Sequence, residues 1–412
     1  MSDAGVRATI LPAMDSSRLS VSLFFATAVA ACQSQAPAWS QAQPQPAAAQ
    51  VWQMQDSGTS ASLRGIDSVD GTVAWASGTE GTVLRTVDGG AHWQKCAVPD
   101  AAKDGATLDF RAVQAFDSDT AFIMSSGKGK LSRLYKTTNG CKAWKRVFTN
   151  PDKDGFWDAL YFDDRHRSSA HGKVFRWLDG WILGDPVGGS FSLYRTANSG
   201  TDWYRQKNAG LRADRSKQGA FAASNSSLID YYGAPSFGSG GSGGAVLYEE
   251  TETRICFDGC SPSDMDPDGK EDKWVQQRVP FGSATESSGI FSVAERFKPR
   301  PPYRDDHVLV AVGGDYSKPS EAANTAAFKP AYDQPWAAST TPPHGYRSTV
   351  QWGESIKAWI TAGTNGSDIS RDDGRTWQPL DNGNWNALSL PFIVGPKGRM
   401  AQLDPAALTV AK

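Results

Sequence analysis

Short apolar runs alternate with polar turns along most of the chain, and the same kind of turn follows several of the runs. One such run is Thr82-Val-Leu-Arg85, and another is Phe191-Ser-Leu-Tyr194. Apolar runs of this length, bounded by turn residues, are typical of β-strands rather than helices. The pattern therefore predicts a β-hairpin unit that is repeated along the chain.

The repeated turn has a hydroxyl residue, then Asp or Asn, then glycine and finally tryptophan at fixed spacing, as in Thr86-Val-Asp-Gly-Gly-Ala-His-Trp93. The Asp or Asn side chain caps N–H groups of its own turn, and glycine accepts a positive φ. These residues resemble the Asp-box, or bacterial-neuraminidase repeat, of β-propellers. The Asp-box lies on the outer hairpins of propellers, which implies a turn-forming and non-catalytic role for Asp88, Asn139, Asn198 and Asp372.

The number of repeats follows from the tryptophan at the end of the turn. Trp52 precedes Trp93 by the same interval that separates Trp336 from Trp377. In all, the position is filled by Trp52, Trp93, Trp144, Trp203, Trp274, Trp336 and Trp377. The sequence therefore predicts an all-β fold, a seven-bladed β-propeller with Asp-box hairpins. The last repeat is one strand short, so we expect 51–55 to supply that strand and close the ring.

Four regions are expected: a signal peptide with a lipobox at 1–32, a flexible Gln/Ala/Pro linker at 33–50, the propeller at 51–404 and a tail at 405–412. The apolar run 19–31 is too short to span a bilayer. It ends in Val29-Ala-Ala-Cys32, which resembles a bacterial lipobox, whose cysteine is lipidated. The alternative is plain cleavage near Ala31. We expect an exported protein, either an outer-membrane lipoprotein or periplasmic, that contacts the membrane only through a lipid anchor.

Several further segments resemble the photosystem II stability and assembly factor-like propellers. They include Leu108-Asp-Phe-Arg111, Gly184-Asp-Pro-Val187, Gly313-Gly-Asp-Tyr316 and Gly345-Tyr-Arg-Ser348. The photosynthetic members of that family are assembly chaperones that bind a membrane-protein partner. The resemblance implies a scaffold that binds a protein partner. We expect a monomer without a cofactor that holds its partner in the cell envelope by an acidic group.

The residues that open the inner strands predict a ligand site, because a propeller brings these positions together around its axis. Arginines at such positions would bind a carboxylate or phosphate bidentately. In the alternative, they pair with nearby aspartates and bind nothing. The predicted ligand-binding residues are Arg64, Arg111, Asp158, Asp185, Asp315 and Arg347.

An enzyme of another class would use some of the same residues. A sialidase-like glycoside hydrolase needs three arginines, a tyrosine nucleophile and acids, for which Tyr316, Asp158 and Asp315 are the candidates. The Arg-Ile-Pro signature of sialidases is absent, and no glycine-rich nucleotide fingerprint is present. The formal net charge of −2 gives no reason to expect nucleic-acid binding. We expect a binding protein, with the hydrolase as the alternative.

The cysteines suggest disulfides if the protein is exported. With Cys32 lipidated or removed, the pairing we favour joins Cys96 to Cys141 and Cys256 to Cys260, and free buried thiols are the alternative.

An acidic segment that follows Cys256 and Cys260 resembles the first half of a calcium loop. Its carboxylates are Asp264, Asp266 and Asp268, but Val275 stands where the loop needs a bidentate glutamate. We expect a solvated acidic loop and no metal site, with weak calcium binding as the alternative.

The lipobox leads to the first testable prediction. Cys32→Ser should release the protein from the membrane fraction, because the lipid is expected to be its only anchor. Gln33 after the cysteine favours sorting to the outer membrane. Fractionation of cells that express the wild type and the variant measures this, and a wild type found wholly in the periplasmic fraction would overturn the lipoprotein hypothesis.

Overall fold

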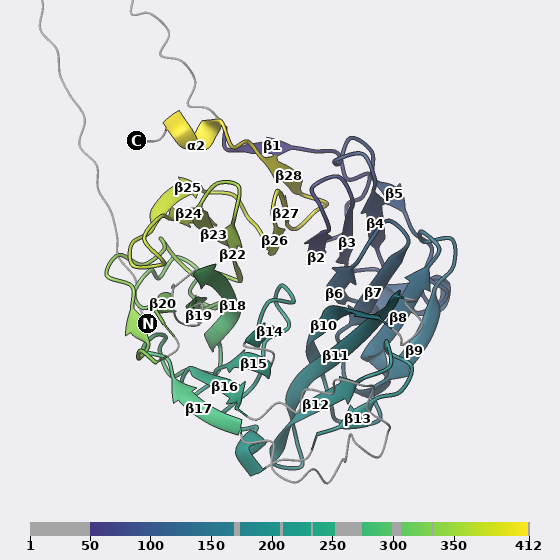
Figure 1. The fold of residues 1–412 in the computed structure, drawn as a ribbon, viewed down its shortest axis with the longest axis horizontal. Helices are drawn as coiled ribbons and strands as arrows, with labels where there is room; N and C mark the ends of the chain where they lie inside the picture. The colour runs from purple at the N-terminus through teal and green to yellow at the C-terminus, as the bar shows by residue number, and fades with distance from the viewer. Residues whose placement is uncertain are drawn as a thin grey trace, which may run out of the picture. The chain divides into compact units, whose positions relative to one another are not determined.

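The computed structural model describes residues 50–168, 174–206, 209–231, 234–251, 274–298, 306–331 and 333–410. These residues form seven four-stranded antiparallel sheets, and in six of them the strands follow one another in chain order. The sheets surround a common centre, with the first strand of each sheet innermost (Figure 1). The predicted seven-bladed β-propeller is therefore confirmed.

Each blade runs from an inner strand to an outer one. The first three blades are β2 (Leu63–Ser68), β3 (Ala74–Gly78), β4 (Val83–Thr86) and β5 (Gln94–Lys95); β6 (Phe110–Ala115), β7 (Thr120–Ser125), β8 (Arg133–Thr138) and β9 (Lys145–Thr149); and β10 (Trp157–Ser168), β11 (Val174–Val187), β12 (Ser190–Thr196) and β13 (Tyr204–Arg205). The next three are β14 (Leu228–Tyr231), β15 (Ala234–Ser239), β16 (Val246–Glu250) and β17 (Trp274–Arg278); β18 (Ser288–Lys298), β19 (Asp306–Asp315), β20 (Ala326–Lys329) and β21 (Ala337–Ala338); and β22 (Thr349–Gly353), β23 (Ala358–Gly363), β24 (Gly366–Ser370) and β25 (Gln378–Asp381). Blade seven is β26 (Ala387–Ser389), β27 (Phe392–Val394), β28 (Met400–Leu403) and β1 (Trp52–Met54).

Helical structure is confined to short connections in the described residues. These are α1 (Ala101–Asp104), α2 (Ala407–Val410) and the 3₁₀ turns Gly105–Thr107, Gly129–Leu131 and Ala209–Leu211. Within the described segments, no helix has the length and apolar character needed to cross a membrane.

The ring is closed by β1, which comes from the opposite end of the chain to its neighbour. β1 pairs antiparallel with β28, with Trp52 opposite Leu403. The Trp52 side chain is buried, and its Nε1 donates a hydrogen bond to Ser367 Oγ of blade six over 2.9 Å. On the other side, Trp93 Nε1 of blade one donates to Gln55 Oε1 over 3.2 Å. The predicted closure by the N-terminal strand is confirmed, and it links blade seven to both of its neighbours.

The Asp-box turns have the hydrogen bonds that their residue types suggest. In the first copy, Asp88 Oδ1 accepts a bond from Thr86 Oγ1 over 2.8 Å and one from the His92 N–H over 3.0 Å. The Gly90 N–H donates to Thr86 Oγ1 over 3.0 Å. The bonds from the turn N–H and side chain of His92, and from Thr86, lower the pKa of Asp88 to about 2. The copies around Asn198 and Asp372 repeat these three bonds. The acidic and amide side chains therefore serve the turn itself.

A disulfide joins Cys96, which follows β5 of blade one, to Cys141 in the Asp-box turn of blade two, with the two Cα atoms 5.5 Å apart. Cys141 has a φ of 69°, at the position where the first copy has Gly90 with a φ of 85°. The two cysteines are 45 positions apart in the sequence. By loop entropy alone, a bridge that closes a loop of this length stabilises the fold by about 4 kcal/mol. Cys256 and Cys260 lie outside the described residues.

The hydrophobic core lies between blades rather than at the centre of the ring. Between blades one and two, for example, Trp75 and Trp144 meet edge to face with ring centroids 5.8 Å apart, and Phe110 and Tyr135 pack beside them. Similar buried clusters fill the other interfaces between neighbouring blades. Each blade therefore depends on its neighbours to bury its two faces.

Deletion of 51–55 should lower the melting temperature sharply, because it exposes the edge of β28 and removes buried Trp52 from the cluster of blades six and seven. Thermal unfolding followed by circular dichroism measures the effect. Met54→Ala is the matched control, since the Met54 side chain is 49% exposed in the same strand, and it should leave the melting temperature nearly unchanged. Identical curves for the deletion and the wild type would show that ring closure does not need β1.

Candidate functional site

Residues 220–226, which we call the axial segment, cross the centre of the ring before β14 begins (Figure 1). The segment bonds to several blades. Ala222 O accepts a bond from Arg111 Nη1 of blade two over 2.7 Å, and Asn225 Oδ1 accepts one from the Leu160 N–H of blade three over 2.7 Å. Ser224 Oγ donates to Ser348 O of blade six over 2.6 Å.

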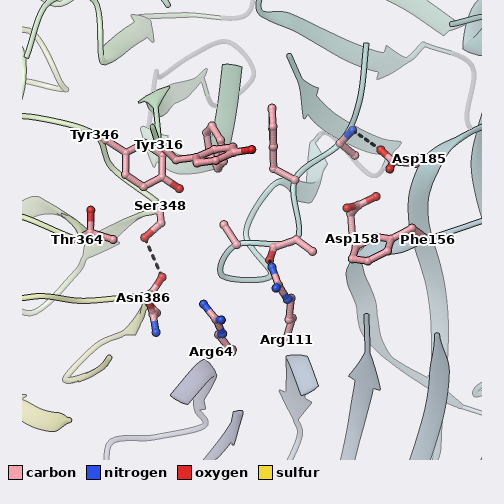
Figure 2. A pocket seen from close by; sticks show the side chains of 15 residues that line it. Arg64, Arg111, Phe156, Asp158, Asp185, Tyr316, Tyr346, Ser348, Thr364 and Asn386 are labelled. Carbon is pink, nitrogen blue, oxygen red and sulfur yellow. Dashed lines mark hydrogen bonds between the residues drawn. The ribbon is translucent and has the colours of Figure 1, made fainter. Parts of the chain in front are cut away.

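The axial segment divides the centre into two cavities. The larger one, the axial pocket, has a volume of about 450 Å³ and lies at the end where the inner strands begin. Residues 220–223 line it, whereas residues 224–226 line the second cavity, further along the inner strands. The side chains that face the axial pocket include Arg64, Arg111, Phe156, Asp158, Asp185, Phe221, Phe291, Tyr316, Tyr346, Ser348, Thr364 and Asn386 (Figure 2).

One side of the axial pocket is basic. The pairing of β2 with β3 is irregular at Arg64, and that of β6 with β7 at Arg111, and both side chains reach the pocket from these bulges. Arg111 Nε donates to Asp109 Oδ2 over 2.8 Å, and Arg64 Nε lies 3.6 Å from the other oxygen of the same carboxylate. Burial lowers the pKa of Arg64, and the Asp109 charge opposes that shift. Two guanidinium groups therefore share one carboxylate.

Another side of the pocket is acidic. Asp158 lies at a bulge in β10 and Asp185 at a bulge in β11. Asp158 is only 2% exposed, and its Oδ2 has no hydrogen-bond partner in the part of the chain that the structure describes. Burial, and then the neighbouring Asp185 charge, raise the pKa of Asp158 well above its usual value. Burial also raises the pKa of Asp185, whose Oδ1 accepts a bond from the Ala220 N–H over 3.2 Å.

Aromatic side chains form the wall of the pocket opposite the arginines. Phe221 of the axial segment stacks on Phe291 with ring centroids 4.0 Å apart, and Tyr346 meets Phe291 edge to face at 4.8 Å. Tyr316, at the rim, is 54% exposed. This wall suits an apolar stem between polar groups of a ligand.

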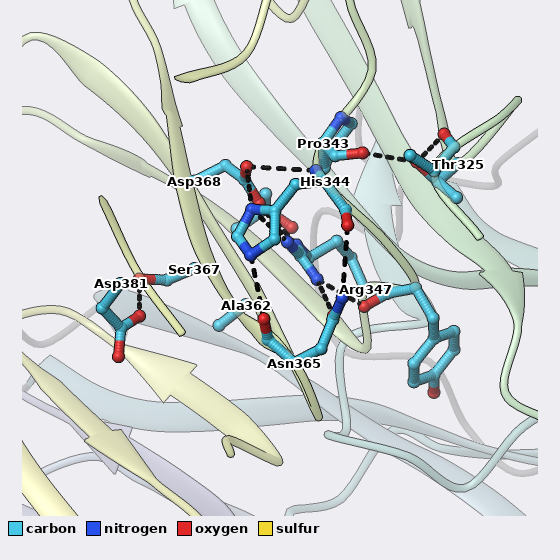
Figure 3. Close-up of polar contacts among 12 residues, drawn as sticks. Thr325, Pro343, His344, Arg347, Ala362, Asn365, Ser367, Asp368 and Asp381 are labelled. Atoms are coloured by element: carbon cyan, nitrogen blue, oxygen red, sulfur yellow. Dashed lines mark hydrogen bonds and ion pairs between the residues drawn. The ribbon is translucent and has the colours of Figure 1, made fainter. Parts of the chain in front are cut away.

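The structure does not bring Arg347 to this pocket, and the expectation of three arginines at one opening is corrected to two. Strand β22 begins only at Thr349, so Ser348 faces the pocket and Arg347 is fully buried inside blade six. Arg347 Nε donates to Asp368 Oδ2 over 2.6 Å, and Nη1 donates to Asn365 Oδ1 over 2.6 Å (Figure 3). The network ties β22 to β24 and leaves Arg347 no access to a ligand.

Asp315 is also placed away from the pocket lining. It ends β19, and its carboxylate accepts hydrogen bonds from Ser287 Oγ over 2.6 Å, Ser317 Oγ over 2.6 Å and Thr285 Oγ1 over 3.0 Å. Burial would raise the pKa of Asp315, but these bonds outweigh it and lower the pKa to about 2. The carboxylate therefore orders the loops beside Tyr316.

The parts of a sialidase-like site are not assembled in this arrangement. With Arg347 inside blade six, two arginines face the pocket where the hydrolase needs three for the substrate carboxylate. Of the two acid candidates, Asp158 lines the pocket and Asp315 does not. Among the described residues, no cluster of His, Cys, Asp and Glu could hold a metal ion. The calcium-loop candidates Asp264, Asp266 and Asp268 lie outside the described residues.

Asp109 and the aromatic wall were not predicted from the sequence as parts of the site. Asp109 could have been found, since it stands two positions before Arg111, and residues at that spacing share one side of an extended chain. Phe221 could not, because its place follows from the path of the axial segment across the ring.

Comparisons with known proteins agree with the fold. The model of the family described as "Photosynthesis system II assembly factor YCF48" matches residues 45–157. A solved structure of YCF48 bound to D1 peptide is 16% identical, with a TM-score of 0.51 over 86% of this chain and 96% of that chain. The structure of YCF48 from Cyanidioschyzon merolae is 19% identical, with a TM-score of 0.52 over 86% of this chain and 99% of that one. No curated protein matches the chain significantly. The family match agrees, over residues 45–157, with the resemblance that the sequence shows, and the two solved structures share the propeller fold.

Asp158 should add a pH dependence to the free energy of unfolding, and Asp158→Asn should lack it. Because its pKa is raised in the folded state, folding takes up a proton above about pH 4, where the unfolded carboxyl is already ionised. Wild-type stability should therefore fall relative to the variant as pH rises from about 4 through the folded-state pKa, by up to about 1.4 kcal/mol per pH unit. Urea unfolding across this pH range measures the difference, and parallel curves for the two proteins would contradict it.

Proposed function

We propose that this protein is an exported scaffold of the assembly-factor type, which holds a protein partner by an acidic group placed in the axial pocket. In general terms, the protein is a propeller that binds another protein and has no catalytic activity. More specifically, the acidic group of the partner binds Arg64 and Arg111, which face the pocket from blades one and two.

One observation carries this proposal: two guanidinium groups in one cavity share the single carboxylate of Asp109. Arg111 uses Nε for Asp109 and Nη1 for Ala222 O, and Arg64 Nε has no hydrogen-bond partner among the described residues. Further N–H donors of both groups are therefore available to an oxyanion. A carboxylate that enters would balance the second positive charge and accept bonds from both arginines.

The comparisons support a protein partner. The family match covers residues 45–157, which include both pocket arginines. One of the similar structures, at 16% identity, is a YCF48 bound to a peptide. A site that accepts an extended segment of another protein is therefore compatible with this fold.

We place this activity in the cell envelope, with a monomeric propeller that reaches its partner from the membrane through a lipid at Cys32. The support is the lipobox and the Gln/Ala/Pro stretch at 33–50, which is long enough to act as a flexible tether. The disulfide between Cys96 and Cys141 is compatible with an oxidising compartment.

Arg64→Ala and Arg111→Ala should each weaken partner binding at least tenfold, since one charge-assisted hydrogen bond contributes about 1.5–3 kcal/mol. The partner is first captured from envelope extracts with the wild type and identified by mass spectrometry, and its dissociation constant is then measured for each variant. Added salt should weaken wild-type binding, because the contact is between charges.

Arg375→Ala is the matched control, because Arg375 is exposed on the outer hairpin of blade six, and it should bind like the wild type. If both pocket variants bind the identified partner with wild-type affinity, the binding surface lies elsewhere. If instead the purified protein cleaves a sialoside and Tyr316→Phe abolishes that activity, the hydrolase alternative replaces this proposal.

A further inference from the structure

The basic and acidic sides of the axial pocket are not joined to each other by ion pairs in the described residues. Arg64 and Arg111 pair with Asp109. Within the described segments, neither Asp158 nor Asp185 forms an ion pair with an arginine or lysine. Figure 2 shows the two aspartates and the two arginines in separate parts of the same cavity. The pocket thus keeps its two arginines and its two aspartates apart.

The acidic side of the pocket also has a carboxylate oxygen that lacks a hydrogen-bond partner among the described residues. Asp158 Oδ2 is buried and faces the cavity without a hydrogen-bond partner among the described residues, although buried polar atoms in folded proteins are nearly always paired. A second carboxylate, Asp185, lies in the same wall. Burial raises the pKa of both carboxyl groups, and the neighbouring Asp185 charge raises that of Asp158 further. A cationic donor placed between them would supply the missing bond and allow both to ionise.

The space between the two sides fits the body of such a ligand. The stacked rings of Phe221 and Phe291, with Tyr346 against them, give an apolar surface along the same cavity. A cavity of about 450 Å³ holds a few side chains of a peptide but no folded element.

We propose that the axial pocket recognises a zwitterionic peptide segment, whose carboxylate binds Arg64 and Arg111 while an ammonium group of the same segment binds Asp158 and Asp185. This inference rests on the proposed function for its acidic half and adds the basic half. It defines the partner segment as one that carries an acidic and a basic side chain a few residues apart. A purely acidic segment would leave Asp158 unpaired and would bind less tightly.

The test uses synthetic peptides capped at both ends, with Glu and Lys separated by one, two or three alanines. For the best spacing, one matched peptide replaces Lys with norleucine and another replaces Glu with Gln. With the wild-type protein, isothermal titration calorimetry should show that each replacement weakens binding by about tenfold or more. With Asp158→Asn, the norleucine peptide should bind as well as the lysine peptide, while the Gln peptide should still bind more weakly.

The number of protons released on peptide binding is a second measurement. If Asp158 had only a structural role, peptide binding would not release protons from it. Binding of the Glu–Lys peptide should release protons from the aspartate pair, so the measured enthalpy should vary with the ionisation enthalpy of the buffer, and the norleucine peptide should not show this. Asp154→Asn is the control, because Asp154 is an exposed carboxylate in the loop before β10 that pairs with Lys128, and it should preserve the preference for lysine. If Asp158→Asn does not fold, Asp185→Asn takes its place.

The outcomes separate the two proposals. If the wild type distinguishes Glu from Gln but not Lys from norleucine, the acidic-group function stands and the zwitterionic inference is overturned. If it distinguishes neither, both are overturned. A preference for lysine that survives in both Asp158→Asn and Asp185→Asn would also overturn the inference, because the ammonium group would then bind elsewhere.

Discussion

The burial of each blade against its neighbours is the constraint on which this structure depends. A four-stranded sheet has two faces, and in this protein both are covered only by the adjacent blades. A row of such sheets would leave an apolar face uncovered at each end, so the row must become a ring. The ring in turn needs β1 from the start of the chain beside β28 from its end, and Trp52 is buried at this junction. The two ends of the propeller therefore have to meet before the interfaces on both sides of blade seven are complete.

The pocket follows from the same geometry. Inner strands that begin at one end of the ring place the bulged residues of different blades around one cavity. Arg64, Arg111 and Asp158 therefore line the same pocket although they are far apart in the chain. The site is therefore carried by strands and held from several directions, which limits how far each side chain can move. Fixed side chains of this kind are what the proposed recognition of charge at set positions needs.

The fold could be predicted from the sequence because the repeat fixes it locally. The tryptophan position, the Asp-box turn and the missing last strand are each contained in a few neighbouring residues. The site was predicted only in part, because it depends on where each inner strand starts. Strand β22 begins one residue later than Ser348, at Thr349, so Ser348 faces the pocket. Arg347 lies in the core of blade six, where Asp368 neutralises it. The partners Asp109 and Asp368 and the path of the axial segment depend on tertiary contacts that no local pattern contains.

The axial segment separates the axial pocket from the second cavity at the centre of the ring. Its bonds to Arg111, Leu160 and Ser348 reach three different blades, so residues 220–226 span the centre and the axial pocket is a blind cup instead of a through-channel. A peptide segment of the kind proposed for this pocket would therefore enter and leave by the same opening, as a chain end or the tip of a loop.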